Sequence, residues 1–281
     1  MTKNTARTTV HLAAHLAALL ATACALPLLT ACEWFDYHPY CVDITGETDI
    51  NAKNIAKIEE LTKGRTSFRF ALISDTQRWY DETEDLVADL NSRDDIDFIV
   101  HAGDFTDFGA NQEFLWQRDI LQGLNAPYVG IIGNHDCLAT GKQTFKRVWG
   151  DLNFAFTAGD VRFVCLNTNA LEFDYSNPVP DMSFIASEID GFPEECTRAI
   201  VAEHCRPFDD EFNDNMARYY HEVVKMLPGM MFTISGHCHS LRQDDLFGDG
   251  YIYYTTTCVE DRAYRIFDIK EDGYTYETVT F

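Results

Sequence analysis

Two short stretches, DFIVHAGDFTD (residues 97–107) and PYVGIIGNHD (residues 127–136), decide how this chain folds. In each, a run of apolar residues leads to a glycine and then to a polar side chain, Asp104 in the first and Asn134 in the second. A short apolar run bounded by such a turn signal is typical of a buried strand. Glycine permits a sharp turn and a close approach of the backbone to its neighbours. Both stretches therefore predict a buried strand that delivers polar groups into a loop.

The same arrangement recurs at three other places in the chain. Apolar residues 68–74 lead to Asp75-Thr76-Gln77, residues 199–203 lead to His204-Cys205-Arg206-Pro207, and residues 231–235 lead to Gly236-His237-Cys238-His239. We expect helices near residues 82–91, 112–124, 142–149, 183–189 and 211–226, and further strands at 154–157, 161–167, 251–256, 263–269 and 274–280. Strands that alternate with helices predict an α/β domain, and open α/β sheets bind ligands beyond the carboxyl ends of their strands.

The polar groups at these strand ends suit a transition metal. They combine imidazole nitrogens with carboxylate and amide oxygens. This mixture favours Mn, Fe, Zn or Ni over Mg or Ca, which prefer oxygen ligands alone.

Residues 1–31 have the features of an export signal. They contain Lys3 and Arg7 but no acidic residue, and the apolar run from Leu16 to Leu29 is too short for a comfortable membrane span. The run ends in Leu29-Thr30-Ala31-Cys32, which resembles the lipobox of bacterial lipoproteins and predicts lipidation of Cys32. Two alternatives are Cys24 as the modified residue and a plain secretory signal cleaved after Ala31.

We divide the remainder into a tether and lead-in at residues 32–66, with a helix at 50–63, and a single catalytic domain at 67–281. Of nine cysteines, removal of the leader and lipidation would leave seven, and an odd, scattered set does not indicate a disulfide framework. Cys196 and Cys205 could still pair.

The composition restricts the partners. The chain has 22 Lys and Arg against 45 Asp and Glu, a formal net charge of −23, and 46% hydrophobic residues. It is therefore expected to fold, and it is poorly suited to bind nucleic acid or an anionic lipid surface by charge.

The five motifs, in this order, resemble the calcineurin-like metallophosphoesterase superfamily from about Phe68 to the C-terminus. The pattern of that family is Asp-x-His, Gly-Asp-x-x-Asp, Gly-Asn-His-Asp/Glu, a lone His, and Gly-His-x-His. The resemblance implies a four-layer α/β/β/α sandwich. It also implies hydrolysis of a small phosphate monoester or diester by a hydroxide that bridges two divalent transition-metal ions (Mn, Fe, Zn or Ni).

The resemblance assigns roles to individual residues. Asp104 would bridge both ions; Asp75, Gln77 and His239 would complete the first site, and Asn134, His204 and His237 the second. His135 would face the substrate, with Asp136 orienting its ring. The family has histidine where this chain has Gln77, a weaker ligand for such metals, so we expect one tight and one loose ion.

The positions of several neighbouring residues indicate further roles. Arg78 or Arg206 could clamp a phosphate. Strand alternation would turn Cys205 and Cys238 away from the metals, which makes them packing residues. We expect His101 to pack in the core, His221 to lie on the surface, and Asp209, Asp210 and Glu211 to begin a helix. The segment 171–195 is expected to determine specificity.

Together these features predict a metal-dependent phosphoesterase, exported and tethered to a bacterial cell membrane or outer membrane by a lipid on Cys32. The alternative is a lipoprotein that keeps the fold as a binding scaffold with weak or no catalysis.

Overall fold

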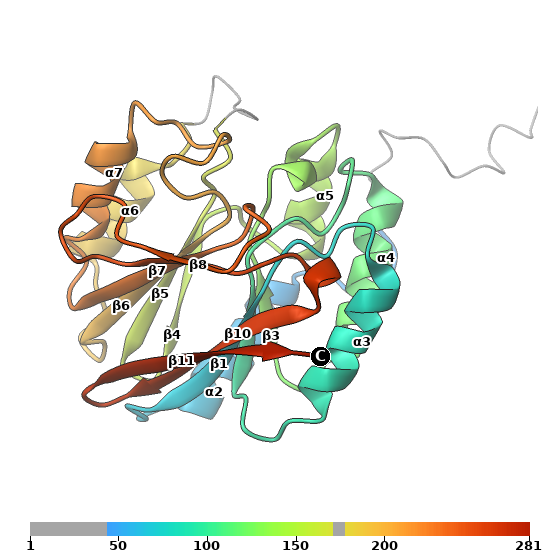
Figure 1. Cartoon of the computed structure of the whole chain (residues 1–281), viewed down its shortest axis with the longest axis horizontal. Helices are drawn as coiled ribbons and strands as arrows, with labels where there is room; N and C mark the ends of the chain where they lie inside the picture. Colours follow the sequence, from blue (N-terminus) through green and yellow to red (C-terminus); the bar gives the residue numbers. More distant parts are fainter. Residues whose placement is uncertain (1–43, 171–177) are drawn as a thin grey trace, which may run out of the picture. The chain divides into compact units, whose positions relative to one another are not determined.

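A computed structural model describes residues 44–170 and 178–281, and the compact unit to which they belong spans Val42–Phe281. Within these residues the strands form two sheets that lie face to face (Figure 1). One sheet has the strand order β11-β10-β1-β2-β3 and the other the order β4-β5-β6-β7-β9-β8.

The first sheet is built around three parallel strands. It contains β1 (Phe68–Ile73), β2 (Phe98–His101), β3 (Tyr128–Gly130), β10 (Ala263–Lys270) and β11 (Gly273–Thr280). β1 pairs in parallel with β2, and β2 with β3, whereas β10 and β11 join antiparallel at the other side of β1.

The second sheet repeats this plan with four parallel strands. It contains β4 (Phe154–Ala158), β5 (Val161–Leu166), β6 (Arg198–Glu203), β7 (Met230–Ser235), β8 (Arg242–Asp244) and β9 (Tyr253–Thr255). β5, β6, β7 and β9 are mutually parallel, and β4 and β8 add antiparallel edges. The short strand β8 was not expected from the sequence.

Helices cover the outer face of each sheet (Figure 1). They are α3 (Tyr80–Asn91), α4 (Asn111–Leu121), α5 (Gly141–Val148), α6 (Met182–Asp190) and α7 (Ala217–Val224). The helix α2 (Ile50–Thr62) instead lies along the edge strands β3 and β4. Apolar residues of α3, α4 and α5 pack on the first sheet, and those of α6 and α7 on the second. The four-layer α/β/β/α architecture is therefore confirmed.

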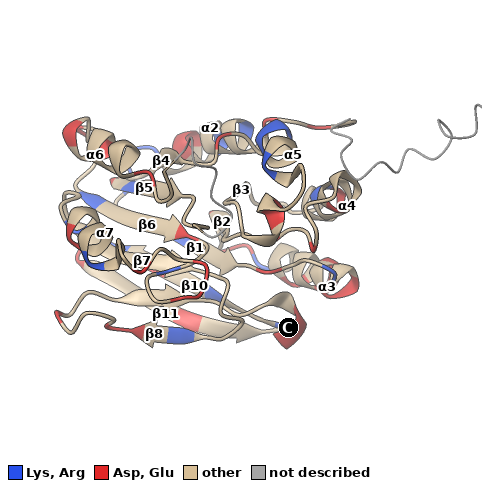
Figure 2. Cartoon of the chain, turned by 90° about the horizontal axis from the view of Figure 1, so that it is seen from above, with Lys and Arg blue, Asp and Glu red and all other residues tan. Residues whose placement is uncertain are grey.

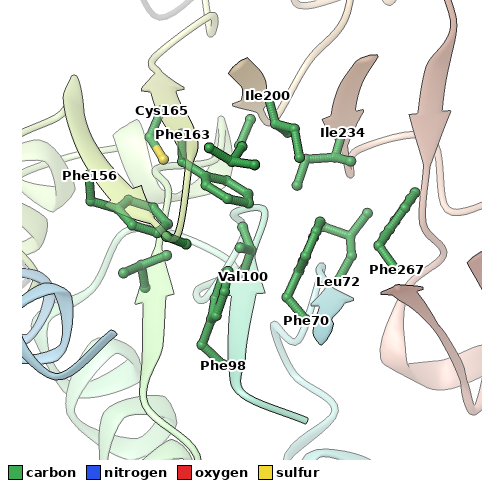
Figure 3. Close-up of a cluster of buried hydrophobic side chains, with 14 of the residues drawn as sticks. Phe70, Leu72, Phe98, Val100, Phe156, Phe163, Cys165, Ile200, Ile234 and Phe267 are labelled. Carbon is green, nitrogen blue, oxygen red and sulfur yellow. The ribbon is translucent and has the colours of Figure 1, made fainter. Parts of the chain in front are cut away.

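The core between the sheets is rich in phenylalanine (Figure 3). The ring of Phe70 stacks on those of Phe98 and Phe267, with centroids 5.4 and 5.1 Å apart, and meets Phe163 of the other sheet edge-on at 5.3 Å. Alternate residues of β1 point the other way, so that Ala71 contributes to the cluster beneath α3–α5. Burial on both faces explains why β1 is a continuous apolar run rather than an alternating one.

The lead-in helix belongs to this unit rather than preceding it. Ile58 of α2 enters the core between the sheets, and Ile50 joins the cluster beneath α3–α5. The side-chain amide of Asn51 exchanges two 2.8 Å hydrogen bonds with the backbone of Gly130, which covers the edge strand β3. The helix α2 is therefore part of the compact unit Val42–Phe281.

The helix expected at 211–226 is shorter, because residues 209–216 form turns and α7 begins at Ala217. The prediction that His221 lies on the surface was wrong. Its imidazole is fully buried, stacks on Phe247 and lies 3.0 Å from Asp249 Oδ2 and 3.1 Å from the Tyr253 hydroxyl. A polar residue on the inner face of an amphipathic helix can be buried when such partners exist.

The excess negative charge lies largely on outer helices and loops (Figure 2). α3 alone carries Asp81, Glu82, Glu84, Asp85 and Asp89.

In the part of the chain that the structure describes, no helix is long and apolar enough to cross a bilayer. Cys196 and Cys205 are both free thiols, so they do not pair. The leader and Cys32 lie outside the described residues.

An arginine of intermediate exposure, Arg198, ties the two sheets together at the amino-terminal end of β6. Arg198 donates to both carboxylate oxygens of Asp160 in its own sheet, at 2.5 and 3.0 Å. It also donates to the carbonyl oxygens of Thr66 and Lys270, which flank β1 and β10 of the other sheet, at 2.9 and 2.5 Å. Burial raises the pKa of Asp160, but the hydrogen bonds from Arg198 and Thr197 outweigh it, so this pKa lies below 3.8.

We expect Asp160→Asn to lower the free energy of unfolding by about 1–3 kcal/mol at pH 7, because a charge-assisted hydrogen bond is lost. Since the folded pKa is lowered, the contribution of the carboxylate is fully present above its unfolded pKa and disappears as the pH falls through the folded value. Urea unfolding at pH 7 and at about pH 2.5 measures this. An equal deficit at both pH values would contradict it; Glu60→Gln, on the exposed face of α2, serves as the neutral control.

Candidate metal centre

Five loops bring their polar side chains together at the carboxyl ends of the strands. Those following β1, β2 and β3 supply Asp75, Gln77, Asp104 and Asn134, and those following β6 and β7 supply His204, His237 and His239. The two sheets meet here, because the backbone N–H of His237 donates to Asp75 Oδ2 at 3.1 Å. The hydrogen bonds and ion pairs described below connect all seven predicted ligands.

Asp104 lies at the centre of this group and is only 1% exposed. Its Oδ1 accepts the backbone N–H of His135 at 3.0 Å, and its Oδ2 lies 3.3 Å from His204 Nε2 and 3.4 Å from Gln77 Nε2. Gly133 makes this possible, because a Cβ at that position would lie 2.1 Å from Asp104 Oδ1. One carboxylate therefore touches ligands of both expected sites.

The second set of ligands is held by Asn134. Its Oδ1 lies 3.0 Å from His204 Nε2 and 3.1 Å from His237 Nδ1. The other nitrogen of each ring is also engaged: His204 Nδ1 faces the Ala102 carbonyl at 2.6 Å, and His237 Nε2 faces Asp210 Oδ1 at 2.7 Å. These outer contacts orient each imidazole and direct its remaining nitrogen towards the centre.

The first set contains Asp75, His239 and Gln77. Asp75 is fully buried, and its Oδ1 lies 3.3 Å from His239 Nε2. The Oε1 atom of Gln77 is buried without a hydrogen-bond partner, while Nε2 faces Asp104. A 180° rotation of the Gln77 amide would exchange its oxygen and nitrogen. Oε1 would then lie beside Asp104 Oδ2, where both oxygens could bind the same metal ion.

Four of the seven candidate ligands have strained backbones. Asp75, Asp104, His237 and His239 have φ values of 55°, 59°, 66° and 43°, in the left-handed region that residues other than glycine rarely adopt. Each costs about 1–3 kcal/mol, and such positions cluster at functional sites.

The electrostatics favour a cation at the centre. Burial lowers the pKa of His204, but Asp104 and Asp75 outweigh this and raise it to about 10. Hydrogen bonds to Asp75 and Cys258 likewise raise the pKa of His239 to about 10. The same carboxylates that stabilise positive charge on these rings would stabilise a divalent ion between them.

The donor set fits the binding of divalent metal. Neighbouring candidate ligand atoms are 3.0–3.3 Å apart, and ligands bound at about 2.0–2.2 Å to one ion are separated by roughly this distance. A bound metal would also provide a partner for the buried Oε1 atom of Gln77. It would do the same for the imidazole nitrogens that face only oxygen atoms.

His135 occupies the short 3-10 turn His135–Cys137 beside this group. Its Nδ1 donates to the carbonyl oxygen of Asp107 at 2.8 Å, so this backbone group orients the ring. The prediction that Asp136 orients it was wrong. The buried Asp136 carboxylate instead accepts the N–H groups of Phe105, Thr106 and Gly133 at 2.9–3.0 Å and so ties the second motif to the third.

The two predicted phosphate clamps are both paired with carboxylates. Arg78 is exposed at the rim and donates from Nε to Asp107 Oδ1 at 2.8 Å. The substrate role predicted for Arg206 was wrong: its side chain is only 4% exposed and lies 2.5 Å from Asp244 and 3.5 Å from Asp209. A buried, paired guanidinium acts as a structural anchor.

The acidic run 209–211 supports the site rather than a helix. Asp210 contacts His237, and Asp209 Oδ1 accepts the Cys238 thiol at 3.0 Å. The sequence did not show these roles, because a run of carboxylates resembles the start of a helix. The signal that could have shown them is the position of the run, which begins five residues after His204. His101 is buried as expected, stacked on Phe105.

With this geometry the class of protein is clear: the sequence model of the calcineurin-like phosphoesterases matches residues 68–241, and the chain belongs to this family. The human serine/threonine-protein phosphatase CPPED1 is 28% identical over 134 residues. This match covers 40% of the present chain and 41% of CPPED1, so the chain spans less than half the length of that relative.

Solved structures share the fold at low sequence identity. A dimetal phosphatase from Danio rerio has a TM-score of 0.54 and 16% identity, covering 76% of this chain and 99% of its own. Purple acid phosphatase PPD1 from yellow lupin has a TM-score of 0.56 and 14% identity, and the match covers 77% of this chain and 54% of that one. GAP50, an inner-membrane-complex anchor of Plasmodium, has a TM-score of 0.57 and 12% identity, and the match covers 77% of this chain and 85% of that one.

Removal of the Asp210 carboxylate should weaken metal binding without unfolding the protein. Because Asp210 orients His237 from an exposed position, we expect Asp210→Ala to lower the affinity for zinc about 10- to 100-fold. Competition with a chromophoric chelator measures this. Glu222→Ala, which removes an exposed carboxylate of α7, is the matched control, and equal affinities in all three proteins would contradict the expectation.

Proposed function

We propose that this protein hydrolyses a phosphate monoester or diester at a dinuclear metal centre. The observation that carries the proposal is the buried carboxylate of Asp104, which contacts His204 of one ligand set and Gln77 of the other. When bound, two divalent ions would acidify a water molecule and neutralise the phosphoryl oxygens.

The protein side chains would then position and protonate the substrate. Because the proton on His135 Nδ1 is committed to the Asp107 carbonyl, Nε2 is the atom that would contact the substrate. A protonated His135 would donate from Nε2 to the leaving oxygen. Arg78, held at the rim by Asp107, would lie close enough to this loop to assist in binding an anionic substrate.

A cavity of about 530 Å³ offers space for the organic part of the substrate. Its wall begins at Ala139 and Thr140, just after the turn that carries His135, and continues along Lys142 and Lys146 of α5. Asn167, at the carboxyl end of β5, and Phe184 of α6 lie opposite. In this proposal, α6, which belongs to the segment 171–195, would contribute to specificity.

Export and lipid anchoring are part of the same proposal. They rest on the basic start, the apolar run and the Leu29-Thr30-Ala31-Cys32 sequence of the leader. A lipid on Cys32 would tether the phosphoesterase on the non-cytoplasmic side of a bacterial membrane.

The alternative is a scaffold with weak or no catalysis, favoured by Gln77 in place of the family's histidine. GAP50 shows that this fold occurs in a protein described as an anchor. The intact second set, Asn134, His204 and His237, argues for retained metal chemistry.

We expect the purified protein to keep one metal ion through extensive dialysis and to lose the other, because a neutral amide oxygen at Gln77 binds transition metals more weakly than imidazole. Gln77→His should retain about two ions per chain under the same treatment, as in a site with a complete imidazole set. Metal analysis after dialysis provides the measurement. Two ions retained by the wild type would contradict this expectation.

The activity itself is tested with chromogenic phosphate mono- and diesters in the presence of Mn²⁺, Zn²⁺, Ni²⁺ or Fe²⁺. We expect Asp104→Asn to abolish hydrolysis and to lower the metal content, because this carboxylate contacts both ligand sets. His135→Gln should lower kcat about 10²- to 10⁴-fold, the usual contribution of a general acid, and leave the metal content unchanged. Leu61→Ala, on the exposed face of α2, controls for handling. The proposal fails for these substrates if no metal supports activity that depends on Asp104.

A further inference from the structure

The sulfur of Cys205 lies among the ligands of the second metal site. Its Sγ, a ring nitrogen of His204 and a ring nitrogen of His237 are all within 4.8 Å of one another. All three side chains are largely buried, and Cys205 and His204 are completely so. A thiol in such a group is a potential metal ligand, because thiolate and imidazole together are common zinc donors.

The position of this sulfur has a clear structural cause. β6 ends at Glu203, and residues 204 and 205 form a bend, so the alternation of side chains that would turn Cys205 away does not continue past the strand. The backbone N–H of Cys205 donates to Thr168 Oγ1 at 3.2 Å, and the thiol donates to Asn169 Oδ1 at 3.2 Å.

Asn169 holds the thiol in a defined place. Its Nδ2 group donates to the Ile132 carbonyl at 3.0 Å and to Asn167 Oδ1 at 2.9 Å, which links the third motif to the end of β5. Asn169 is fully buried, so its amide oxygen has no solvent to bind. The S–H contact to Asn169 is weak, so a metal ion could replace it as the partner of the sulfur.

Cys238 provides an internal comparison. It occupies the corresponding position after His237, but its thiol donates to Asp209 Oδ1 at 3.0 Å, and Cys238 is not part of a metal-binding group within the described residues. The two cysteines that follow ligand histidines thus differ: one joins the imidazoles and the other contacts a carboxylate behind them.

We propose that Cys205 is a thiolate ligand of the second metal ion, beside His204, His237 and Asn134, and that it makes this site selective for thiophilic ions such as Zn²⁺, Co²⁺ or Cd²⁺ over Mn²⁺. The inference rests on the proposed metal centre. On binding, the thiol releases its proton to solvent and the sulfur lone pair forms the bond to the ion. A soft sulfur donor stabilises soft and borderline ions more than hard ones.

X-ray absorption of the protein loaded with one equivalent of zinc tests this proposal. We expect one sulfur scatterer at about 2.3 Å together with nitrogen and oxygen scatterers at about 2.0–2.1 Å. Cys205→Ser should lose the sulfur scatterer and Cys238→Ser should retain it. Competition between Cd²⁺ and Mn²⁺ should also favour Cd²⁺ less in Cys205→Ser than in Cys238→Ser.

The outcomes separate this inference from the proposed function. Zinc bound by nitrogen and oxygen alone in the wild type overturns thiolate ligation and leaves the metallophosphoesterase proposal intact. A sulfur scatterer that persists in Cys205→Ser also overturns it, because another cysteine is then the ligand. Failure of the wild type to bind zinc, with no activity with any metal, overturns both. The wild-type spectrum decides the question even if the serine variant does not fold.

Discussion

The buried carboxylate of Asp104 is the contact on which the rest of the site depends. It lies in the loop that follows β2, with a left-handed backbone and almost no exposure. Its carbonyl oxygen accepts the N–H groups of Thr76 and Gln77, so the first loop is wrapped around the second. Because Gly133 has no side chain, the third loop can approach the Asp104 carboxylate closely. A negative charge so deeply buried is stable only beside cations, which explains the imidazoles around it.

Much of this arrangement could be predicted because it depends on short-range sequence patterns. The five ligand loops follow buried strands that are visible as apolar runs, and parallel strands bring their carboxyl ends to one edge. The layer order came from the family resemblance, since local patterns do not determine which sheet a strand joins. β8 escaped notice because Arg242–Asp244 is a short, polar edge strand.

The errors share a physical cause: each depended on a partner distant in sequence. His221 is buried because Asp249 and Tyr253 satisfy its ring, and Arg206 is buried because Asp244 neutralises it. Asp136 is next to His135 in sequence, but its acceptors are matched by the N–H groups of the second motif. The direction of the Cys205 side chain could not be predicted either, because this residue lies two positions beyond the end of β6, where strand alternation no longer applies. Side-chain pairing of this kind is a property of the folded chain and not of a sequence window.

The distribution of the candidate ligands between the sheets has a mechanical consequence. Asp75, Asp104 and Asn134 come from one sheet and the three histidines from the other, at the end of the sandwich opposite to the tie formed by Arg198. Any ion bound at this edge would therefore link the two sheets, and its binding free energy would add to the stability of the native state. The resistance of the protein to unfolding and proteolysis then follows the free metal concentration of its surroundings, so that scarcity of metal would limit its lifetime as well as its chemistry.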